Sequence, residues 1–152
     1  YYKDTGIYED DNINWCVYSL VDDNKKPELK TNTNNKNIGL FHGPIVGLRT
    51  DVGFTFEEGF DVTLFDGMDL VLAGDIHKRQ IFDIPGGKKA YMVGSLIQQN
   101  FGESIKNHGY GLYNVSENNY KFFDVDNERL YLQFKITDIE DIENGKEKLI
   151  NR

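Results

Sequence analysis

Two short apolar segments each run directly into a histidine-containing loop, and this pattern constrains the fold more than any other feature of the chain. Residues 37–41 lead into a His-Gly-Pro loop at 42–44, and residues 69–73 lead into a Gly-Asp-Ile-His turn at 74–77. Short, continuous apolar runs are typical of strands buried on both faces of a sheet. The pattern predicts an α/β or layered α+β sheet, with a functional site at the ends of its strands.

The rest of the chain offers further short strands and one helix. The segment from Asn14 to Val21 is rich in aromatic and β-branched residues and fits a strand, whereas residues 22–37 are polar and predict an exposed loop. Residues 1–12 are polar and predict no element. Thr137 and Asp138 are expected to cap a final helix that reaches Leu149. Other strand candidates, separated by turn residues, lie at 80–84, 90–93, 111–115, 120–125 and 130–136.

Composition limits the classes of protein to which the chain can belong. Its 152 residues, 39% of them hydrophobic, are enough for one modest core. Cys16 is the sole cysteine, which excludes an internal disulfide, and no apolar run approaches the roughly 20 residues that cross a bilayer. We therefore expect a cytoplasmic protein, in the host cytoplasm if the source is viral, without membrane contact. The net charge of -8 argues against a protein that coats nucleic acid.

The histidines at the two strand ends form a candidate metal site. Asp75 and His77 are two residues apart, so on an extended backbone their side chains leave the same face of the chain. Imidazole and carboxylate together suit Mn, Fe or Zn. Taken alone, however, an Asp-x-His and a distant histidine are a weak metal signal, because a single histidine is more often an ordinary surface or core residue than a ligand.

Three motifs in sequence order add a family resemblance. They are FHGPIVG at 41–47, LVLAGDIHKRQ at 70–80 and GSLIQQNFGE at 94–103. Together they resemble the later motifs of the calcineurin-like metallophosphoesterases, specifically the SbcD-type nucleases and their phage recombination-nuclease relatives. The resemblance implies the second half of a two-layered metallophosphoesterase sandwich of mixed sheets with flanking helices. Residues 1–125 would be the C-terminal portion of the nuclease domain, and residues 126–152 the start of a capping segment.

The resemblance also implies a binuclear site for two divalent ions, Mn first, with Mg, Fe or Zn as alternatives. His42 and Asp75 would ligate one ion and His77 the other, while Lys78 and Ser95 would contact the substrate. Asp75 stands where the family has the first histidine of a Gly-His-x-His motif. Because a carboxylate is harder and more anionic than imidazole, this difference is expected to shift the metal preference.

The earlier motifs of the family do not occur before His42. These motifs are Asp-x-His, Gly-Asp-x-x-Asp and Gly-Asn-His, and no histidine at all precedes His42. Asp75-Ile-His77 is itself an Asp-x-His, but neither of the other two motifs follows it. We therefore expect the 152 residues to hold part of a site and to be inactive alone.

The function implied by the resemblance is that of a metal-dependent DNA exonuclease or endonuclease, a hydrolase subunit of a repair and recombination complex. Its implied partners are DNA, an SbcC-like coiled-coil ATPase and a second copy of the full protein. Two alternatives stay open. One is a calcineurin-like phosphoesterase that acts on a small phosphodiester or a phosphoprotein. The other is a degenerate, non-catalytic binding module.

Overall fold

The computed structural model describes residues 2–22, 29, 34–133 and 136–150. Within these residues the chain forms an α+β fold dominated by a mixed six-stranded sheet, with a separate two-stranded hairpin and few helices. The strands are β1 (Gly6–Asp10), β2 (Ile13–Tyr18), β3 (Lys36–His42), β4 (Leu70–Gly74), β5 (Gln80–Ile84), β6 (Lys88–Met92), β7 (Gly109–Asn114) and β8 (Asn119–Asp124). The helices are the 3-10 turns η1 (Val62–Phe65) and η2 (Pro85–Gly87) and the α-helix α1 (Ile139–Ile150).

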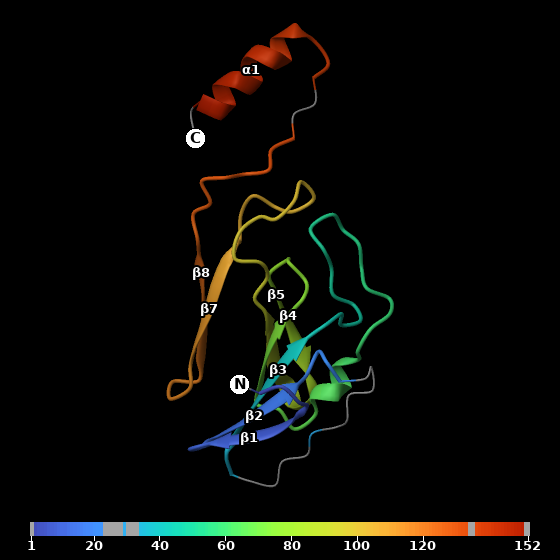
Figure 1. Ribbon diagram of the computed structural model, residues 1–152, viewed down its shortest axis with the longest axis vertical. Coiled ribbons are helices and arrows are strands. Elements are labelled where there is room, and N and C mark those ends of the chain that lie inside the picture. Colours follow the sequence, from blue (N-terminus) through green and yellow to red (C-terminus); the bar gives the residue numbers. More distant parts are fainter. Residues whose placement is uncertain (1, 23–28, 30–33, 134–135, 151–152) are drawn as a thin grey trace.

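The six-stranded sheet has the order β1-β2-β3-β4-β6-β5 (Figure 1). Its four central strands, β2, β3, β4 and β6, run parallel, while β1 and β5 pair antiparallel at the two edges. Parallel strands bring their carboxyl ends to one edge of the sheet, which is where ligand sites form in sheets of this kind. The loops after β3, β4 and β6 therefore leave the sheet at the same end.

One face of the sheet carries the core. Side chains alternate along each strand, and the register aligns those of neighbouring strands in rows across this face. The segment between β3 and β4 covers the rows and contributes the fully buried Ile45 and Phe65. The two rows are Cys16, Gly39, Val71 and Ala90, and Tyr18, Phe41, Ala73 and Met92.

An aromatic cluster fixes η1 to this face. The rings of Tyr18 and Phe41 pack edge-on against Phe65, with centroids 5.8 Å and 5.2 Å away. The Tyr18 hydroxyl also donates a hydrogen bond of 3.0 Å to the carbonyl of Leu64. Edge-to-face rings combine area burial with favourable quadrupole geometry. The cluster thereby holds the β3–β4 connection against the strands whose ends it joins.

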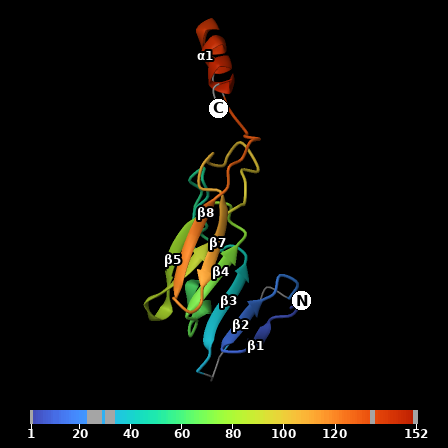
Figure 2. The same ribbon diagram turned by 90° about the vertical axis from the view of Figure 1, so that its left-hand side faces the viewer.

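The β7–β8 hairpin covers part of the opposite face (Figure 2). Tyr120 of β8 stacks on Tyr91 of β6 with ring centroids 4.0 Å apart. At the turn of the hairpin, the Lys36 ammonium donates a hydrogen bond of 2.7 Å to the Asn118 side chain. The hairpin therefore reaches from the β6 side of the sheet to the start of β3.

Most predicted elements are confirmed, and the exceptions have physical causes. The predicted strands that correspond to β2 to β8 are present. Strand β1 was not predicted, because it is a polar edge strand that forms through backbone pairing with β2 and has no apolar pattern. The predicted strand at 130–136 is wrong over residues 130–133, and residues 134–135 lie outside the described chain. There Tyr131 pairs with a side chain: its N–H donates to Gln98 Oε1, and its carbonyl accepts from Gln98 Nε2. Most of the predicted loop at 22–37 also lies outside the described residues.

The predicted C-terminal helix is confirmed as α1. Asp138 Oδ1 accepts from the Asp141 N–H at 3.1 Å, and Asp141 Oδ2 accepts from the Asp138 N–H at 3.2 Å. This reciprocal capping box starts the helix where the sequence predicts it. In Figures 1 and 2, α1 lies apart from the sheet. Among the described residues, no helix is long and apolar enough to cross a membrane.

Replacing Phe65 by alanine tests the aromatic cluster. Phe65 is fully buried, so we expect the F65A substitution to lower the free energy of unfolding by about 3–5 kcal/mol. Phe54 is 58% exposed and serves as the matched control, with an expected loss below about 1 kcal/mol. Urea denaturation followed by far-UV circular dichroism measures both. Equal losses in the two variants would contradict the assignment of the core to this face.

Candidate functional site

The ends of β3 and β4 lie side by side and position the first two candidate ligands. His42 is in register with Gly74, and the Gly43 N–H donates to the Gly74 carbonyl at 3.3 Å. The His42 ring lies across Gly74: a Cβ built at that glycine would lie 3.0 Å from His42 Cδ2. A larger residue at position 74 would therefore displace the imidazole. The glycine of the second motif thus has a steric role at this site.

His42 and Asp75 are brought together by this arrangement. The distance from His42 Nδ1 to Asp75 Oδ1 is 3.8 Å, and the two side chains are 51% and 39% exposed. Asp75 has φ +100°, a left-handed conformation that non-glycine residues seldom adopt. Such backbone strain gathers at functional sites, because the surrounding structure must hold it in place. The unusual backbone conformation therefore supports the hypothesis that the position of the Asp75 carboxylate is functional.

The separation of this pair is compatible with one shared metal ion. His and carboxylate ligands bind Zn at about 2.0–2.2 Å, so two ligands of one such ion lie within about 4.2 Å of each other. The 3.8 Å between His42 and Asp75 falls inside that limit. Across the part of the chain that the structure describes, however, no group of three or more His, Cys, Asp or Glu side chains is close enough to hold an ion.

His77 lies beyond the pair and interacts with a different carboxylate. Its Nδ1 atom is 2.8 Å from Glu103 Oε1, and its side chain is 44% exposed. His77, Asp75 and Glu103 line one cavity of about 290 Å³, together with Asp51 and Lys78. Asp75 and His77 therefore line the same cavity. Of these two residues, Asp75 is the one that lies beside His42. Ligation of a second ion by His77 stays a prediction.

Glu103 organises the loop behind His77. Its side chain is only 7% exposed. Oε1 also accepts from Asn100 Nδ2 at 2.6 Å, and Oε2 accepts from the Gln99 N–H at 2.8 Å. Burial raises the pKa of this carboxyl, but the hydrogen bonds from His77 and Gln99 and the charge of His77 outweigh that effect and lower the pKa of Glu103 below its usual value. Glu103 is therefore an ionised acceptor at neutral pH.

An ionised acceptor on one side fixes the tautomer of the His77 ring. Because a carboxylate only accepts hydrogen bonds, His77 Nδ1 carries the proton. In the neutral ring the lone pair then resides on Nε2, and this is the form in which imidazole binds metals or accepts protons. Glu103 is the last residue of the third motif, but the sequence alone assigned it no role. Its place in that motif was the signal that could have identified it as a functional residue.

Ser95 lies behind His77 and supports its backbone. The Ser95 N–H donates to the His77 carbonyl at 3.1 Å, and Ser95 Oγ is 2.9 Å from His108 Nδ1. Ser95 and His108 are 6% and 4% exposed. Gly94 permits this approach, since a Cβ at its φ of +81° would lie 2.7 Å from the His77 carbonyl oxygen. These contacts give Ser95 a structural role, and its direct contact with substrate stays a prediction.

Lys78 lines the cavity shared by Asp75 and His77 and also a second cavity beside it. Two lysines that follow the motif, Lys88 and Lys89, are directed elsewhere. Lys88 pairs with Asp69 and Lys89 with Asp83, away from the carboxyl ends of the parallel strands. Lys78 therefore lies at the candidate site, while Arg79 lines the neighbouring cavity.

Comparison with known proteins adds one relative. The chain is 34% identical over 153 residues to "Uncharacterized protein R555" of Acanthamoeba polyphaga mimivirus. The match covers 94% of the chain but only 11% of the length of that relative. No protein-family model matches the chain, and no solved structure matches it. The activity and partners of the chain are therefore inferred from its own residues.

Removal of the Glu103 carboxylate tests the His77 tautomer. At pH 8, long-range ¹H–¹⁵N NMR of the unsubstituted protein should show His77 protonated on Nδ1, because Glu103 accepts that proton. In E103A the Nε2-protonated tautomer should become populated, while the His42 signals stay in place. A His77 ring that is protonated on Nε2 before the substitution would contradict the arrangement.

Proposed function

We propose that the chain forms part of a metal-dependent phosphodiesterase, specifically a DNA nuclease of the SbcD type. The observation that carries the proposal is the juxtaposition of His42 and Asp75, 3.8 Å apart, at the carboxyl ends of two adjacent parallel strands. Both residues belong to the motifs that carry the resemblance. The left-handed backbone of Asp75 gives a physical reason to regard the pair as functional.

In the proposed reaction each residue has a distinct task. A bound divalent ion supplies Lewis-acid activation of water and stabilises charge on the phosphate. His42 and Asp75 would hold one such ion. His77 would hold the second ion, and Glu103, whose carboxylate contacts His77 Nδ1, would keep the ring in the required orientation and tautomer. Lys78 contributes positive charge to the wall of the same cavity.

The exposed part of the sheet is consistent with a second layer. On the face opposite the core, Val17, Leu40 and Leu72 align across β2, β3 and β4 and are only half-buried. They line a hollow of about 370 Å³ that extends to His42. In the proposed two-layered sandwich, a second sheet packs on this face and brings further ligands towards His42. The mixed sheet seen here is then one layer of that sandwich.

DNA is the substrate favoured by the third motif. Residues 94–103 form the loop that supplies Glu103 and contacts the backbone of His77. This motif ties the resemblance to the nuclease branch of the family more closely than to its general phosphatases. An SbcC-like ATPase partner, a dimeric full protein and a capping segment that starts at residue 126 follow from the same resemblance and form part of the proposal. The cytoplasmic location expected from the composition is also part of it.

Metal binding tests the first step of the proposal. Titration of Mn²⁺ into the 152-residue chain, followed by the EPR signal of free Mn²⁺, should show saturable binding. H42A and D75N should each weaken binding about tenfold or more, because each removes a direct ligand. D83N removes an exposed carboxylate that pairs with Lys89 away from the site, so it should bind as the unsubstituted chain does. Equal affinity in all four proteins would contradict the site.

Activity tests the second step. The gene product that contains these residues should degrade linear duplex DNA with Mn²⁺, and D75N should lower that rate about a hundredfold. Faster turnover of bis-p-nitrophenyl phosphate than of DNA would instead favour a small-substrate phosphoesterase. Metal binding without hydrolysis of either substrate would favour a non-catalytic binding module.

A further inference from the structure

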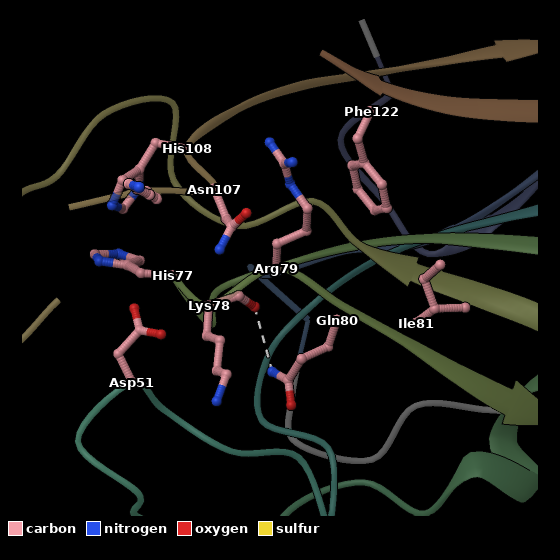
Figure 3. A pocket seen from close by; sticks show the side chains of 10 residues that line it. Asp51, His77, Lys78, Arg79, Gln80, Ile81, Asn107, His108 and Phe122 are labelled. Carbon is pink, nitrogen blue, oxygen red and sulfur yellow. Dashed lines mark hydrogen bonds between the residues drawn. The ribbon is translucent and has the colours of Figure 1, made fainter. Parts of the chain in front are cut away.

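A network of polar side chains continues inward from the candidate metal site. It begins at His77, passes through Glu103 and Ser95, and ends at His108. The side chains of Glu103, Ser95 and His108 are all buried. Figure 3 shows His108 and His77 at the same end of the cavity that both residues line. His108 is thus a buried imidazole, close behind the site, to which the proposed function gives no task.

The His108 ring is fixed by contacts at both of its nitrogens. Nε2 lies 2.6 Å from the Ser104 carbonyl oxygen, and Nδ1 lies 2.9 Å from Ser95 Oγ. A carbonyl oxygen only accepts hydrogen bonds, so Nε2 carries a proton. In the neutral ring Nδ1 then holds a lone pair, and the Ser95 hydroxyl donates to it. The Ser95 carbonyl oxygen, 3.4 Å from Nδ1, is beyond the usual range and already accepts from the Gly109 N–H.

Ser95 has one hydroxyl proton and two acceptors near it. His108 Nδ1 is 2.9 Å from Ser95 Oγ, whereas Glu103 Oε2 is 3.4 Å away. Hydrogen bonds between a hydroxyl and an oxygen are about 2.5–3.0 Å long, so the contact with Glu103 is the weaker of the two. A hydroxyl rotates about its C–O bond. Removing the imidazole acceptor would therefore turn the Ser95 proton towards Glu103.

The donors around Glu103 decide how strongly this carboxylate holds the proton of His77. Oε1 accepts from His77 Nδ1 and from the Asn100 amide, and Oε2 accepts from the Gln99 N–H. These three donors sit on planar groups, whereas the Ser95 hydroxyl can turn. Hydrogen bonds to a carboxylate stabilise its charge and lower its basicity. A donated proton from Ser95 would therefore weaken the hydrogen bond between Glu103 and His77.

We propose that His108 is a positioning residue for His77. It holds the Ser95 hydroxyl away from Glu103, and so keeps the acceptor strength of that carboxylate for the Nδ1 proton of His77. A strong acceptor at one ring nitrogen raises the basicity of the other, which makes an imidazole a better metal ligand. The inference deepens the proposed function and rests on it in one respect, namely that His77 is a ligand.

Long-range ¹H–¹⁵N NMR of the 152-residue chain in EDTA at pH 8 tests the network. In the unsubstituted protein, His108 should be protonated on Nε2 and bare at Nδ1. H108Q keeps a donor for the Ser104 carbonyl but places no acceptor at the position of Nδ1. The His77 Nδ1 resonance should then move upfield, as expected for a weaker hydrogen bond. H108N, whose amide oxygen lies near the position of Nδ1, should leave that resonance in place.

The order of the contacts gives a sharper test. S95A removes the hydroxyl but keeps the backbone N–H that donates to the His77 carbonyl, and Glu103 keeps its three other donors. The His77 Nδ1 resonance should therefore stay in place in S95A, and also in S95A/H108Q, because His108 acts only through that hydroxyl.

A histidine that merely fills space would disturb the loop with or without the Ser95 hydroxyl. An H108Q shift that persists in S95A/H108Q would therefore overturn the proposal, as would an unmoved His77 resonance in H108Q. A His108 ring that carries a proton on Nδ1 in the unsubstituted protein would also overturn it. That last reading needs no substitution, so a folding defect in H108Q leaves the test intact.

Metal binding separates this inference from the proposed function. If the spectra behave as described but the chain binds no Mn²⁺, the positioning role of His108 stands and the metal site falls. If Mn²⁺ binds but the His77 resonance ignores H108Q, the positioning role falls and the metal site stands. Where both hold, H108Q should weaken Mn²⁺ binding about tenfold and H108N should restore it. Equal Mn²⁺ affinity in H108Q and the unsubstituted chain would contradict a role in ligation.

Discussion

The parallel pairing of β3 with β4 is the interaction on which the rest of the structure depends. Its register sets Gly39 opposite Val71 in the core and His42 opposite Gly74 at the carboxyl end. Both contacts are tight: a Cβ at Gly39 would lie 3.0 Å from Val71 Cγ2, and one at Gly74 would lie 3.0 Å from His42 Cδ2. A shift of one residue would reverse the faces of every side chain on the strand. The same register therefore defines the core and the candidate site.

A second constraint comes from the loop that follows β6. This loop returns to the end of β4 and places the buried Glu103 carboxylate against His77. Its hydrogen bonds satisfy the carboxylate from three directions, which is what a buried charge requires. Because the loop also holds Ser95 between Glu103 and His108, the candidate metal site and the network behind it share one support.

The sequence predicts the strands well because their apolar runs are local signals. The family resemblance implies that His42 and Asp75 share a site, and the structure brings them together where His42 ends β3 and Asp75 follows β4. His77 and Glu103 are 26 residues apart in the sequence, and no periodic pattern of residues predicts their contact. The contact of Ser95 with His108 has no local signal either, because it forms only where the loop after β6 meets the residue that precedes β7. The strand predicted at 130–136 shows the converse: over residues 130–133 its apolar pattern forms no strand, and Gln98 pairs with the Tyr131 backbone instead.

The most direct test of the account is a crystal structure of the chain grown with Mn²⁺ and measured for anomalous scattering. The account predicts an anomalous peak at the ends of β3 and β4, within coordination distance of both His42 and Asp75, with the left-handed backbone of Asp75 retained. A peak held by other residues, or occupied Mn²⁺ sites that leave both of these residues without metal, would contradict it.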